Sequence, residues 1–424
     1  MSVESVPQME YMDNPLRIQY RRYVLTLLLA INLLNYIDRQ ILYAVFPLIK
    51  DDFHLSDAAL GFLGSVFMLF YMVSAPVLGW LGDRTNRLRL ASAGLVLWSF
   101  ATIQAGFASS YRMLLWARSF VGIGEASFST VSPTLLADYY PRDLRGRILS
   151  LFYLAIPVGS ALGYILGGIL GENFGWKTAF FMVGVPGLIL SFPLWMSHEP
   201  PRGGFEVSPG KRNAQIRDYL SLFRNRPFVL NTLAMIAMTF AMGGLAQWVP
   251  TFFYRLHRID LATANALFGG IVIASGIIGT LAGGWIGDWL EHRKGTKGYL
   301  LVSGFGLLLG SPVALYALLS PSFPIALGAM FVAAFLLFLN TGPLNTVIVN
   351  VTNPGVRAMA FAVNIFFIHA LGDAFSPALL GWLSDLWGLR TALMITPLAF
   401  LCASAFCFLC SRFVQSDGAS AECN

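Results

Sequence analysis

Four charged side chains lie in otherwise apolar stretches of the sequence. Asp38 and Arg39 end the stretch NYIDR, while Arg118 and Glu125 flank an apolar run in RSFVGIGEAS. Seven residues make nearly two helical turns, so Arg118 and Glu125 share one helix face, about 10 Å apart along its axis. A guanidinium is a permanent cation whose planar donor fork suits phosphate and carboxylate groups. The pattern predicts a buried anion-binding site with acidic neighbours.

The two carboxyl groups add proton exchange to this site. Burial favours a neutral carboxyl and a nearby Arg favours a charged one, so Asp38 and Glu125 can change protonation. We expect protonation of Glu125 to release Arg118 for an anionic headgroup, and loss of the proton to restore an internal pair and expel the ligand. Asp38 lies at an intermediate depth and can pair with Arg118 if their helices are neighbours. The alternative is a structural ion cluster that fixes helix register.

The second half of the chain carries fewer charges in its apolar stretches. His369 and Asp373 are spaced for one helix face, although a histidine satisfied within the core would leave the same pattern. Many Phe residues surround them, which favours an amphiphile with its headgroup on Arg118 and its tail against this half; lipid-facing helices have the same composition. The candidate substrate-binding and proton-coupling residues are Tyr36, Asp38, Arg39, Arg118, Glu125, Asn340, His369 and Asp373.

The composition requires an apolar solvent around these charges. The chain of 424 residues is 56% hydrophobic and 12% charged, whereas a soluble protein is about a quarter charged. A membrane-spanning helix needs about 20 largely apolar residues. Stretches of this kind are predicted at 24–49, 57–80, 89–108, 111–136, 145–171, 177–196, 227–255, 262–290, 298–319, 323–350, 356–383 and 389–413.

These stretches predict an all-α integral membrane fold of twelve transmembrane helices in two pseudo-symmetric six-helix bundles. The expected segments are an N-terminal segment 1–23, a bundle 24–196, a linker 197–226, a bundle 227–413 and a tail 414–424. Lys and Arg concentrate in alternate loops, counting from the N-terminal segment, which predicts that both termini are cytoplasmic. The net charge of +6 then needs no nucleic-acid partner.

Sequence motifs recur between the two halves. GWLGDR at 79–84 returns as GWIGDW at 284–289, and GWKTAFF at 175–181 is echoed by GLRTALM at 388–394. Duplicated halves that rock about a midplane site are typical of secondary transporters. The Gly of each G-x-x-x-D motif permits close helix approach, and the Asp is expected to face a helix N-terminus and latch one conformation. Ordinary loop charges are the alternative. The predicted gate residues are Gly79, Asp83, Arg84, Arg87, Arg145, Gly284, Asp288 and Arg357.

Two glycine ladders with a spacing of four residues predict close helix contacts in lipid. The ladders are explained equally well by static packing of the helices and by helices that slide past one another with low friction. Their members are Gly159, Gly163, Gly167 and Gly171 in the first half, and Gly279, Gly283 and Gly287 in the second.

Together, the two G-x-x-x-D loops, Arg118 followed by G-x-G, and the first glycine ladder resemble the major facilitator superfamily over nearly the whole chain. NYIDR and GIGEA at 122–126 resemble its spinster branch, which is associated with export of sphingosine phosphate and lysophospholipids. The resemblance implies that the first and fourth spans line a central cavity. The short termini and loops look bacterial, which predicts a multi-pass protein of the bacterial inner membrane.

We therefore expect a monomeric secondary transporter, and no enzyme, that moves an anionic amphiphile by alternating access, with proton coupling through Glu125 and Asp38. No phosphate-binding loop, H-E-x-x-H or G-x-S-x-G motif occurs, and the five His are scattered, so neither a cofactor nor a metal is expected. A carrier of small organic anions or drugs remains open, as does a membrane lipid sensor that does not transport.

Overall fold

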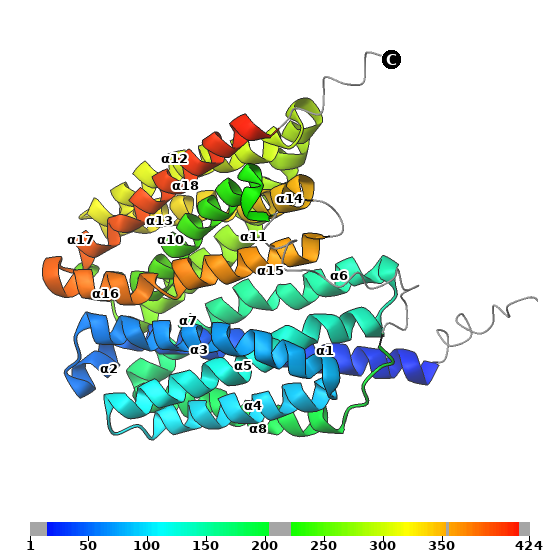
Figure 1. The fold of residues 1–424 in the computed structure, drawn as a ribbon. Coiled ribbons are helices and arrows are strands. Elements are labelled where there is room, and N and C mark those ends of the chain that lie inside the picture. Colours follow the sequence, from blue (N-terminus) through cyan, green and yellow to red (C-terminus); the bar gives the residue numbers. More distant parts are fainter. Residues whose placement is uncertain (1–14, 203–221, 353–355, 415–424) are drawn as a thin grey trace, which may run out of the picture.

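The computed structural model describes residues 15–202, 222–352 and 356–414, and every regular element in these ranges is a helix. In Figure 1 the first half of the chain forms one group of helices and the second half the other. The first group comprises α1 (Pro15–Ala44), α2 (Phe46–Phe53), α3 (Asp57–Arg84), α4 (Arg87–Gly106), α5 (Tyr111–Tyr139), α6 (Arg142–Tyr153), α7 (Ala155–Phe174) and α8 (Trp176–Met196). The second comprises α10 (Arg226–His257), α11 (Leu261–Lys294), α12 (Lys297–Leu319), α13 (Phe323–Phe338), α14 (Thr341–Val351), α15 (Arg357–Ile368), the π-helix η2 (His369–Asp373), α16 (Ser376–Trp387), α17 (Leu389–Leu393) and α18 (Ile395–Phe413).

Within the described ranges, 11 helical stretches are long and apolar enough to cross a membrane. The twelfth expected span is α5, whose 29 residues include Arg118 and Glu125. These charges make α5 more polar than the other spans, yet it packs against both α3 and α4. The prediction of twelve spanning helices in an all-α fold is confirmed. The first helix begins at Pro15, ahead of the expected 24, while residues 1–14, 203–221 and 415–424 of the expected polar segments lie outside the described residues.

Helix starts follow from local side-chain chemistry. A short polar side chain before a helix can accept a hydrogen bond from one of its free backbone N–H groups. Ser56, Asn86 and Ser110 do so at the starts of α3, α4 and α5, and Asn225 and Asp260 do so at α10 and α11. Each of these capping residues marks the position where a loop ends and an apolar helix begins.

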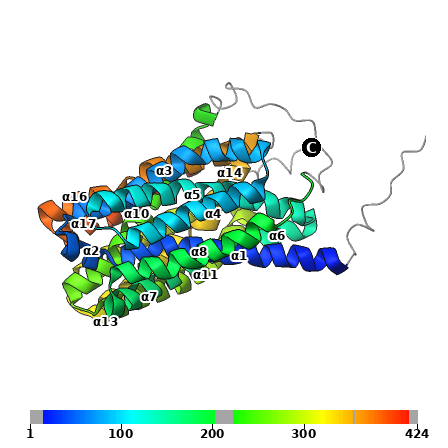
Figure 2. The same cartoon turned by 90° about the horizontal axis from the view of Figure 1, so that it is seen from below.

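Helix pairing repeats between the two halves. In the first half α4 packs against α5 and α8, and α3 packs against α5; in the second half α12 packs against α13 and α18, and α11 packs against α13. The halves meet through α3 with α16 and through α7 with α11, as both views show (Figures 1 and 2). These two contacts are equivalent under exchange of the halves, which agrees with the duplication predicted from the motifs.

The glycine ladders lie inside each half. On α7 they face α1, where a Cβ at Gly163 would lie 2.7 Å from the carbonyl oxygen of Ile37. On α11, Gly279 and Gly283 face α13 and its end, where a Cβ at Gly283 would lie 1.9 Å from the carbonyl oxygen of Leu339, and Gly287 faces Tyr299 of α12. The contact between the halves uses another glycine of α11, Gly269, against Ala161 of α7. The ladders therefore build each bundle, and a different glycine face joins the two.

Helix α1 begins and helix α18 finishes at the same end of the molecule (Figure 1, right). We call this the termini end. The opposite end, where α2, α16 and α17 lie, we call the clamp end. The two groups of helices run close together at the clamp end and diverge towards the termini end.

Candidate functional site

A buried ion pair joins α1 to α5. Arg39 Nε donates a hydrogen bond to Glu125 Oε2 at 2.6 Å. The Glu125 side chain is fully buried and that of Arg39 is 15% exposed. The Arg39 guanidinium carbon also lies 5.0–5.2 Å from the ring centres of Tyr36, Phe67 and Tyr71. This cation is therefore held by one carboxylate and three aromatic faces.

Arg118 does not form the predicted pair with Glu125. Arg39 binds Oε2 of that carboxylate, and Oε1 is buried without a hydrogen-bond partner among the described residues. Seven residues of rise separate Arg118 from Glu125 by about 10 Å along the same helix, whereas Arg39 reaches Glu125 sideways from α1. All three Arg118 guanidinium nitrogens are buried and have no hydrogen-bond partner among the described residues. The centre of the Phe67 ring lies 4.8 Å from the Arg118 guanidinium carbon.

Asp38 lies beside this cation without pairing with it. Thr102 Oγ1 of α4 donates to Asp38 Oδ2 at 2.7 Å, and Asp38 Oδ1 is buried without a partner. The expected Asp38–Arg118 ion pair is not formed, although α1 and α5 are in contact.

Asn35 completes a group of buried polar atoms with unused bonding capacity. Both polar atoms of its side-chain amide are buried and have no partner within the described chain, as is also true of Asp38 Oδ1 and the Arg118 guanidinium. Native proteins satisfy most buried polar groups, so such a concentration calls for an explanation. The sequence analysis did not select Asn35 or Thr102; Asn35 lies one turn before Asp38 in the quoted NYIDR stretch, whereas a lone threonine in an apolar helix carries no comparable signal.

In the second half, His369 and Asp373 contact each other. His369 Nδ1 lies 3.0 Å from Asp373 Oδ1, and the two residues are the first and last of the π-helical turn η2. Single π-turns often occur at functional positions because they interrupt regular helix pairing. This turn contacts α10 of its own half and α3 of the other half. Asn340, by contrast, bonds locally: its Nδ2 donates to the Leu336 carbonyl at 2.8 Å where α13 ends.

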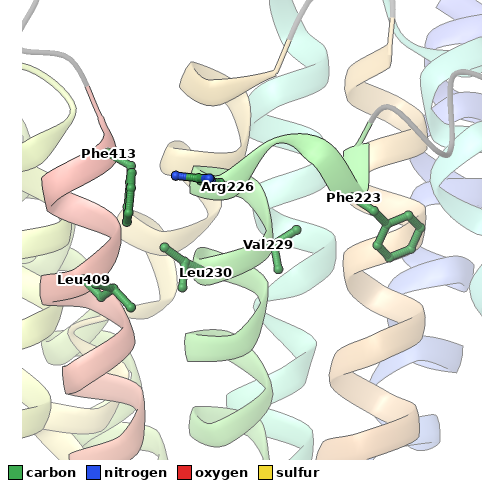
Figure 3. A pocket seen from close by; sticks show the side chains of 6 residues that line it. All are labelled: Phe223, Arg226, Val229, Leu230, Leu409 and Phe413. Atoms are coloured by element: carbon green, nitrogen blue, oxygen red, sulfur yellow. The ribbon is translucent and has the colours of Figure 1, made fainter.

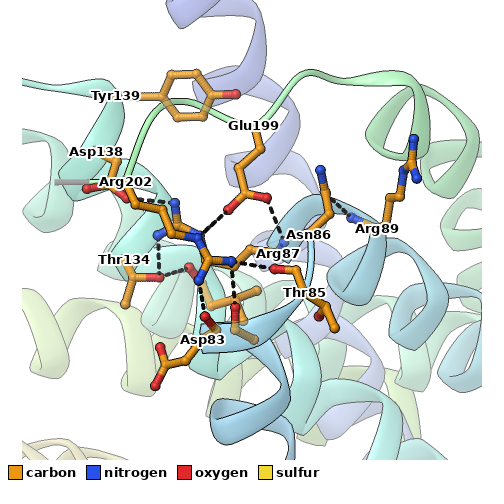
Figure 4. A network of polar contacts seen from close by, with 12 residues as sticks. Asp83, Thr85, Asn86, Arg87, Arg89, Thr134, Asp138, Tyr139, Glu199 and Arg202 are labelled. Atoms are coloured by element: carbon orange, nitrogen blue, oxygen red, sulfur yellow. Dashed lines mark hydrogen bonds and ion pairs between the residues drawn. The ribbon is translucent and has the colours of Figure 1, made fainter. Parts of the chain in front are cut away.

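Arg87, a predicted gate residue, is the centre of a polar network at the termini end (Figure 4). Its Nη2 lies 2.6 Å from Asp138 Oδ2 of α5, and its Nε donates to Glu199 Oε1 at 2.6 Å. Arg202 donates to the backbone carbonyls of Gly82, Asp83 and Thr85. The network ties the α3–α4 loop to α5 and to the chain that follows α8, all within the first half.

The two G-x-x-x-D motifs are disengaged from the opposite half. Gly79 and Gly284 have open space where a Cβ would stand, so the expected close helix approach is absent in this conformation. The Asp83 side chain is exposed, and Asp288 Oδ1 accepts a hydrogen bond from the Tyr299 hydroxyl at 2.7 Å. Arg84 stacks on Trp80 of its own helix, 4.2 Å from the ring centre.

Arg145 and Arg357 occupy equivalent positions in the two halves. Arg145 Nε donates to the Tyr140 carbonyl at 3.1 Å, and Arg357 Nε donates to the Val349 carbonyl at 3.1 Å and to the Thr352 carbonyl at 3.4 Å. Each arginine thus covers free carbonyls where the preceding span ends. This shared geometry agrees with the duplication predicted from the repeated motifs.

At the clamp end, Asp57 gathers partners from both halves, a feature that the sequence analysis missed. Arg255 Nη1 of α10 donates to both of its carboxylate oxygens, at 2.9 and 2.8 Å. Lys50 Nζ lies 2.5 Å from Oδ1, and Ser384 Oγ of α16 donates to Oδ2 at 2.6 Å. In return, Asp385 of α16 accepts from the backbone N–H groups of Asp57 and Ala58, each at 2.8 Å. We call Lys50, Asp57, Arg255, Ser384 and Asp385 the Asp57 clamp.

Two further contacts join the halves near the clamp end. Asn265 Nδ2 of α11 donates to the Ala44 carbonyl at 3.0 Å, and the Ala262 N–H donates to Glu172 Oε2 at 2.6 Å. Within the described residues, no group of three His, Cys, Asp or Glu side chains is arranged to hold a metal ion. The available chemistry is therefore that of buried charge, hydrogen bonds and apolar surface.

Comparison with known proteins identifies the family that shares this arrangement. Residues 28–377 match the Major Facilitator Superfamily. The chain is 34% identical to protein spinster homolog 1 of Xenopus tropicalis, over 96% of this chain and 84% of the relative. The chain belongs to the spinster family of this superfamily. A second spinster relative, the mouse sphingosine-1-phosphate transporter SPNS2, is 34% identical over 92% of this chain and 77% of its own length.

Solved spinster structures agree with the fold. A bacterial homolog of the human lysosomal transporter spinster, in an inward-facing and unoccupied conformation, superposes with a TM-score of 0.84 at 25% identity, covering 93% of this chain and 97% of the other. The inward-facing, occupied form of a bacterial homolog gives a TM-score of 0.83 at 26% identity, with the same coverage. The chain is thus a multi-pass membrane protein of a transporter family and not an enzyme, as expected from its sequence.

Proposed function

We propose that this spinster protein is a secondary transporter of an anionic amphiphile, with Arg118 binding the anionic headgroup. The supporting observation is the Arg118 guanidinium, which belongs to a side chain only 1% exposed and has no hydrogen-bond partner among the residues that the structure describes. A buried charge without a partner is costly, so an anion that supplies the partner gains free energy that a neutral molecule does not. A planar guanidinium binds a phosphate through two parallel hydrogen bonds.

The family favours a lipid-like substrate. Sphingosine-1-phosphate, which the mouse relative transports according to its name, combines one phosphate with an apolar chain. In this chain, α15 and η2 carry exposed apolar side chains on either side of His369, including Phe366 and Leu371. We propose that the substrate tail packs on this surface of the second half while the headgroup reaches Arg118.

We further propose that access alternates by relative motion of the bundles 24–196 and 227–413, joined by the linker 197–226. In the conformation described above, the Asp57 clamp holds one end together while Asp83 is exposed at the other. In the opposite conformation the clamp opens and the two G-x-x-x-D motifs engage neighbouring helices. Charge in alternate loops favours a cytoplasmic termini end, which makes the present conformation inward-facing. Both bundles come from one chain, so a monomer suffices.

Proton coupling is the finer part of the proposal, and the contacts alter the order of events expected from the sequence. A proton on Glu125 would break its hydrogen-bonded pair with Arg39, not with Arg118. A proton on Asp38 would neutralise a buried carboxylate of α1, the helix that contacts the α5 helix of the buried Arg118. We propose that the protonated cluster frees both guanidinium groups for substrate, and that deprotonation restores the internal interactions and releases it.

Transport into reconstituted vesicles tests these points. The substrates are sphingosine phosphate, a lysophospholipid and a small organic anion, each with and without a pH gradient. The proposal requires uptake of at least one lipid phosphate and its loss in Arg118→Gln. A pH-dependent uptake that survives intact in Glu125→Gln and in Asp38→Asn would refute coupling by these carboxyls. Uptake confined to small anions would show that the substrate is a small organic anion and not an amphiphile. Binding without uptake would indicate a lipid sensor that does not transport.

A further inference from the structure

A groove at the termini end of the second half lies outside the central cluster. It is lined by Phe223, Arg226, Val229 and Leu230 at and just before the start of α10, and by Leu409 and Phe413 at the end of α18 (Figure 3). Its volume is about 320 Å³. Phe223 and Phe413 are 51% and 43% exposed, so the groove opens outward.

The groove sits where two spanning stretches end. Arg226 is the first residue of one and Phe413 the last of the other. The Cys410 thiol donates to the Pro227 carbonyl at 3.3 Å, which fixes the start of α10 against the last turn of α18. The apolar walls therefore lie at the depth where acyl chains give way to lipid headgroups.

Arg226 lines the groove, and two more exposed arginines, Arg224 and Arg412, are chain neighbours of the lining residues Phe223 and Phe413. Arg224 and Arg226 flank the cap of α10, and Arg412 lies in the last turn of α18. In the part of the chain that the structure describes, none of them forms an ion pair. The Arg226 guanidinium carbon lies 5.5 Å from the ring centre of Phe413, so its stem crosses the apolar wall while its charged end stays at the rim. Positive charge above an apolar slot is complementary to a lipid with an anionic headgroup.

We propose that this groove binds an anionic phospholipid of the surrounding bilayer, with Arg226 at the lipid phosphate and an acyl chain between α10 and α18. The neighbouring Arg224 and Arg412 add attraction for the headgroup. A bound lipid would bridge the start of α10 and the end of α18, steadying the second half close to its junction with the linker. This site is separate from the central cluster and does not depend on the identity of the transported substrate.

The test measures lipid binding by the purified full-length protein in an uncharged detergent. Two lipids with identical acyl chains are compared, phosphatidylglycerol and phosphatidylcholine. The melting temperature and the equilibrium dissociation constant are followed as each lipid is added. We expect phosphatidylglycerol to bind and raise the melting temperature. Phosphatidylcholine should bind about ten-fold more weakly, because its choline cation cancels the phosphate charge that attracts Arg224, Arg226 and Arg412.

Variants assign the binding to the groove. Arg226→Gln is expected to weaken phosphatidylglycerol binding about ten-fold, and Leu230→Trp is expected to block it by filling the slot. The matched control is Arg89→Gln, because Arg89 is an exposed arginine beside an aromatic ring, 5.8 Å from the centre of Trp195, without this groove. The control should bind as the unaltered chain does.

A photoactivatable phosphatidylglycerol gives a readout that does not depend on the stability of the variants. Crosslinks in the unaltered protein should fall within 223–230 or 409–413. Equal binding of the two lipids, equal losses in Arg226→Gln and Arg89→Gln, or crosslinks confined to other segments would each overturn the proposal.

Discussion

The guanidinium of Arg39 and the carboxylate of Glu125 lie 2.6 Å apart and join two helices from positions 86 residues apart in the sequence. The two side chains differ in the surroundings that remain when the other one is removed. Arg39 is 15% exposed and keeps three aromatic neighbours, whereas Glu125 is fully buried. The pair is therefore asymmetric, and its asymmetry is measurable.

We predict that Arg39→Gln destabilises the protein more than Glu125→Gln does. Breaking a buried pair by removing one partner costs about 3–5 kcal/mol, because the remaining charge is uncompensated. Glu125 is fully buried, so water cannot solvate its carboxylate once Arg39 is removed. Arg39→Gln should therefore approach that cost. The double variant should recover part of the loss. Melting temperatures at one pH check this, and strictly additive losses would show that the two side chains do not interact.

For Arg118 we predict opposite effects on stability and function. Its guanidinium makes no hydrogen bond in the described chain, so Arg118→Met should leave the melting temperature unchanged or higher. Transport of a lipid phosphate should fall about ten- to a hundred-fold, the equivalent of losing a charge-assisted hydrogen bond. Arg118→Lys keeps the positive charge but lacks the planar guanidinium with its paired donors, so it should recover only part of the activity. Arg293→Gln, an exposed arginine stacked on Trp289, controls for net charge. A large drop in the stability of Arg118→Met would argue for a structural role.

Asp57→Asn is predicted to favour separation of the two halves at the clamp end. The change removes the carboxylate that binds Arg255 and Lys50. Spin labels at the exposed positions Ser109 and Arg258, in a cysteine-free background, would report the distance between the halves. We expect a longer distance population to increase.

Asp260→Asn is the matched control for the clamp. Asp260 is another acid near the clamp end, but unlike the buried Asp57 it is exposed, and it accepts its hydrogen bond from the Thr263 N–H of its own helix, α11. This control should leave the distance unchanged. An identical distribution in Asp57→Asn and the unaltered chain would mean that other contacts, not the clamp, hold the halves together.

Glycines at the two ends should respond differently to alanine. A Cβ at Gly61 would lie 2.1 Å from the Pro377 carbonyl oxygen, so Gly61→Ala must push α3 away from α16. A Cβ at Gly79 meets nothing within 4 Å. Because alanine is better than glycine in a helix by roughly 0.5–1 kcal/mol, Gly79→Ala should preserve or raise the melting temperature.

The same Gly79→Ala variant tests the predicted latch. If Gly79 packs closely against another helix in the opposite conformation, the added methyl group should slow transport while leaving the folded protein intact. Gly146→Ala is a suitable control, because this glycine of α6 also faces open space and lies outside the motif. Unimpaired transport by Gly79→Ala would remove the close-approach argument for the motif.

Sequence patterns predicted the spans well because apolar length is a local property. Even α5 was recognised, although Arg118 and Glu125 lower its hydropathy below that of the other spans. The pairing of its charges was not predictable in the same way. Spacing along one helix tells which side chains share a face, but the partner of Glu125 depends on how α1 lies against α5. That information is absent from either segment alone.

The Asp57 clamp illustrates the same limit at a larger scale. Asp57 follows the capping residue Ser56 and looks like an ordinary acid in the first turn of a helix. Its partners Arg255 and Ser384 come from helix ends 198 and 327 residues away. Charges at span ends are common, so nothing in the local sequence separates a contact between the halves from a solvated loop charge.

Arg145 and Arg357 cover the ends of equivalent spans, and each half of the molecule contains an even number of crossings. A unit with an even number of crossings starts and finishes on the same face of a membrane. A tandem copy of its gene therefore inserts the second unit in the same orientation as the first, with no extra crossing needed between them. The polar connection between α8 and α10 is all that such a fusion requires, so an ancestral dimer of two identical units could become a single chain in one step.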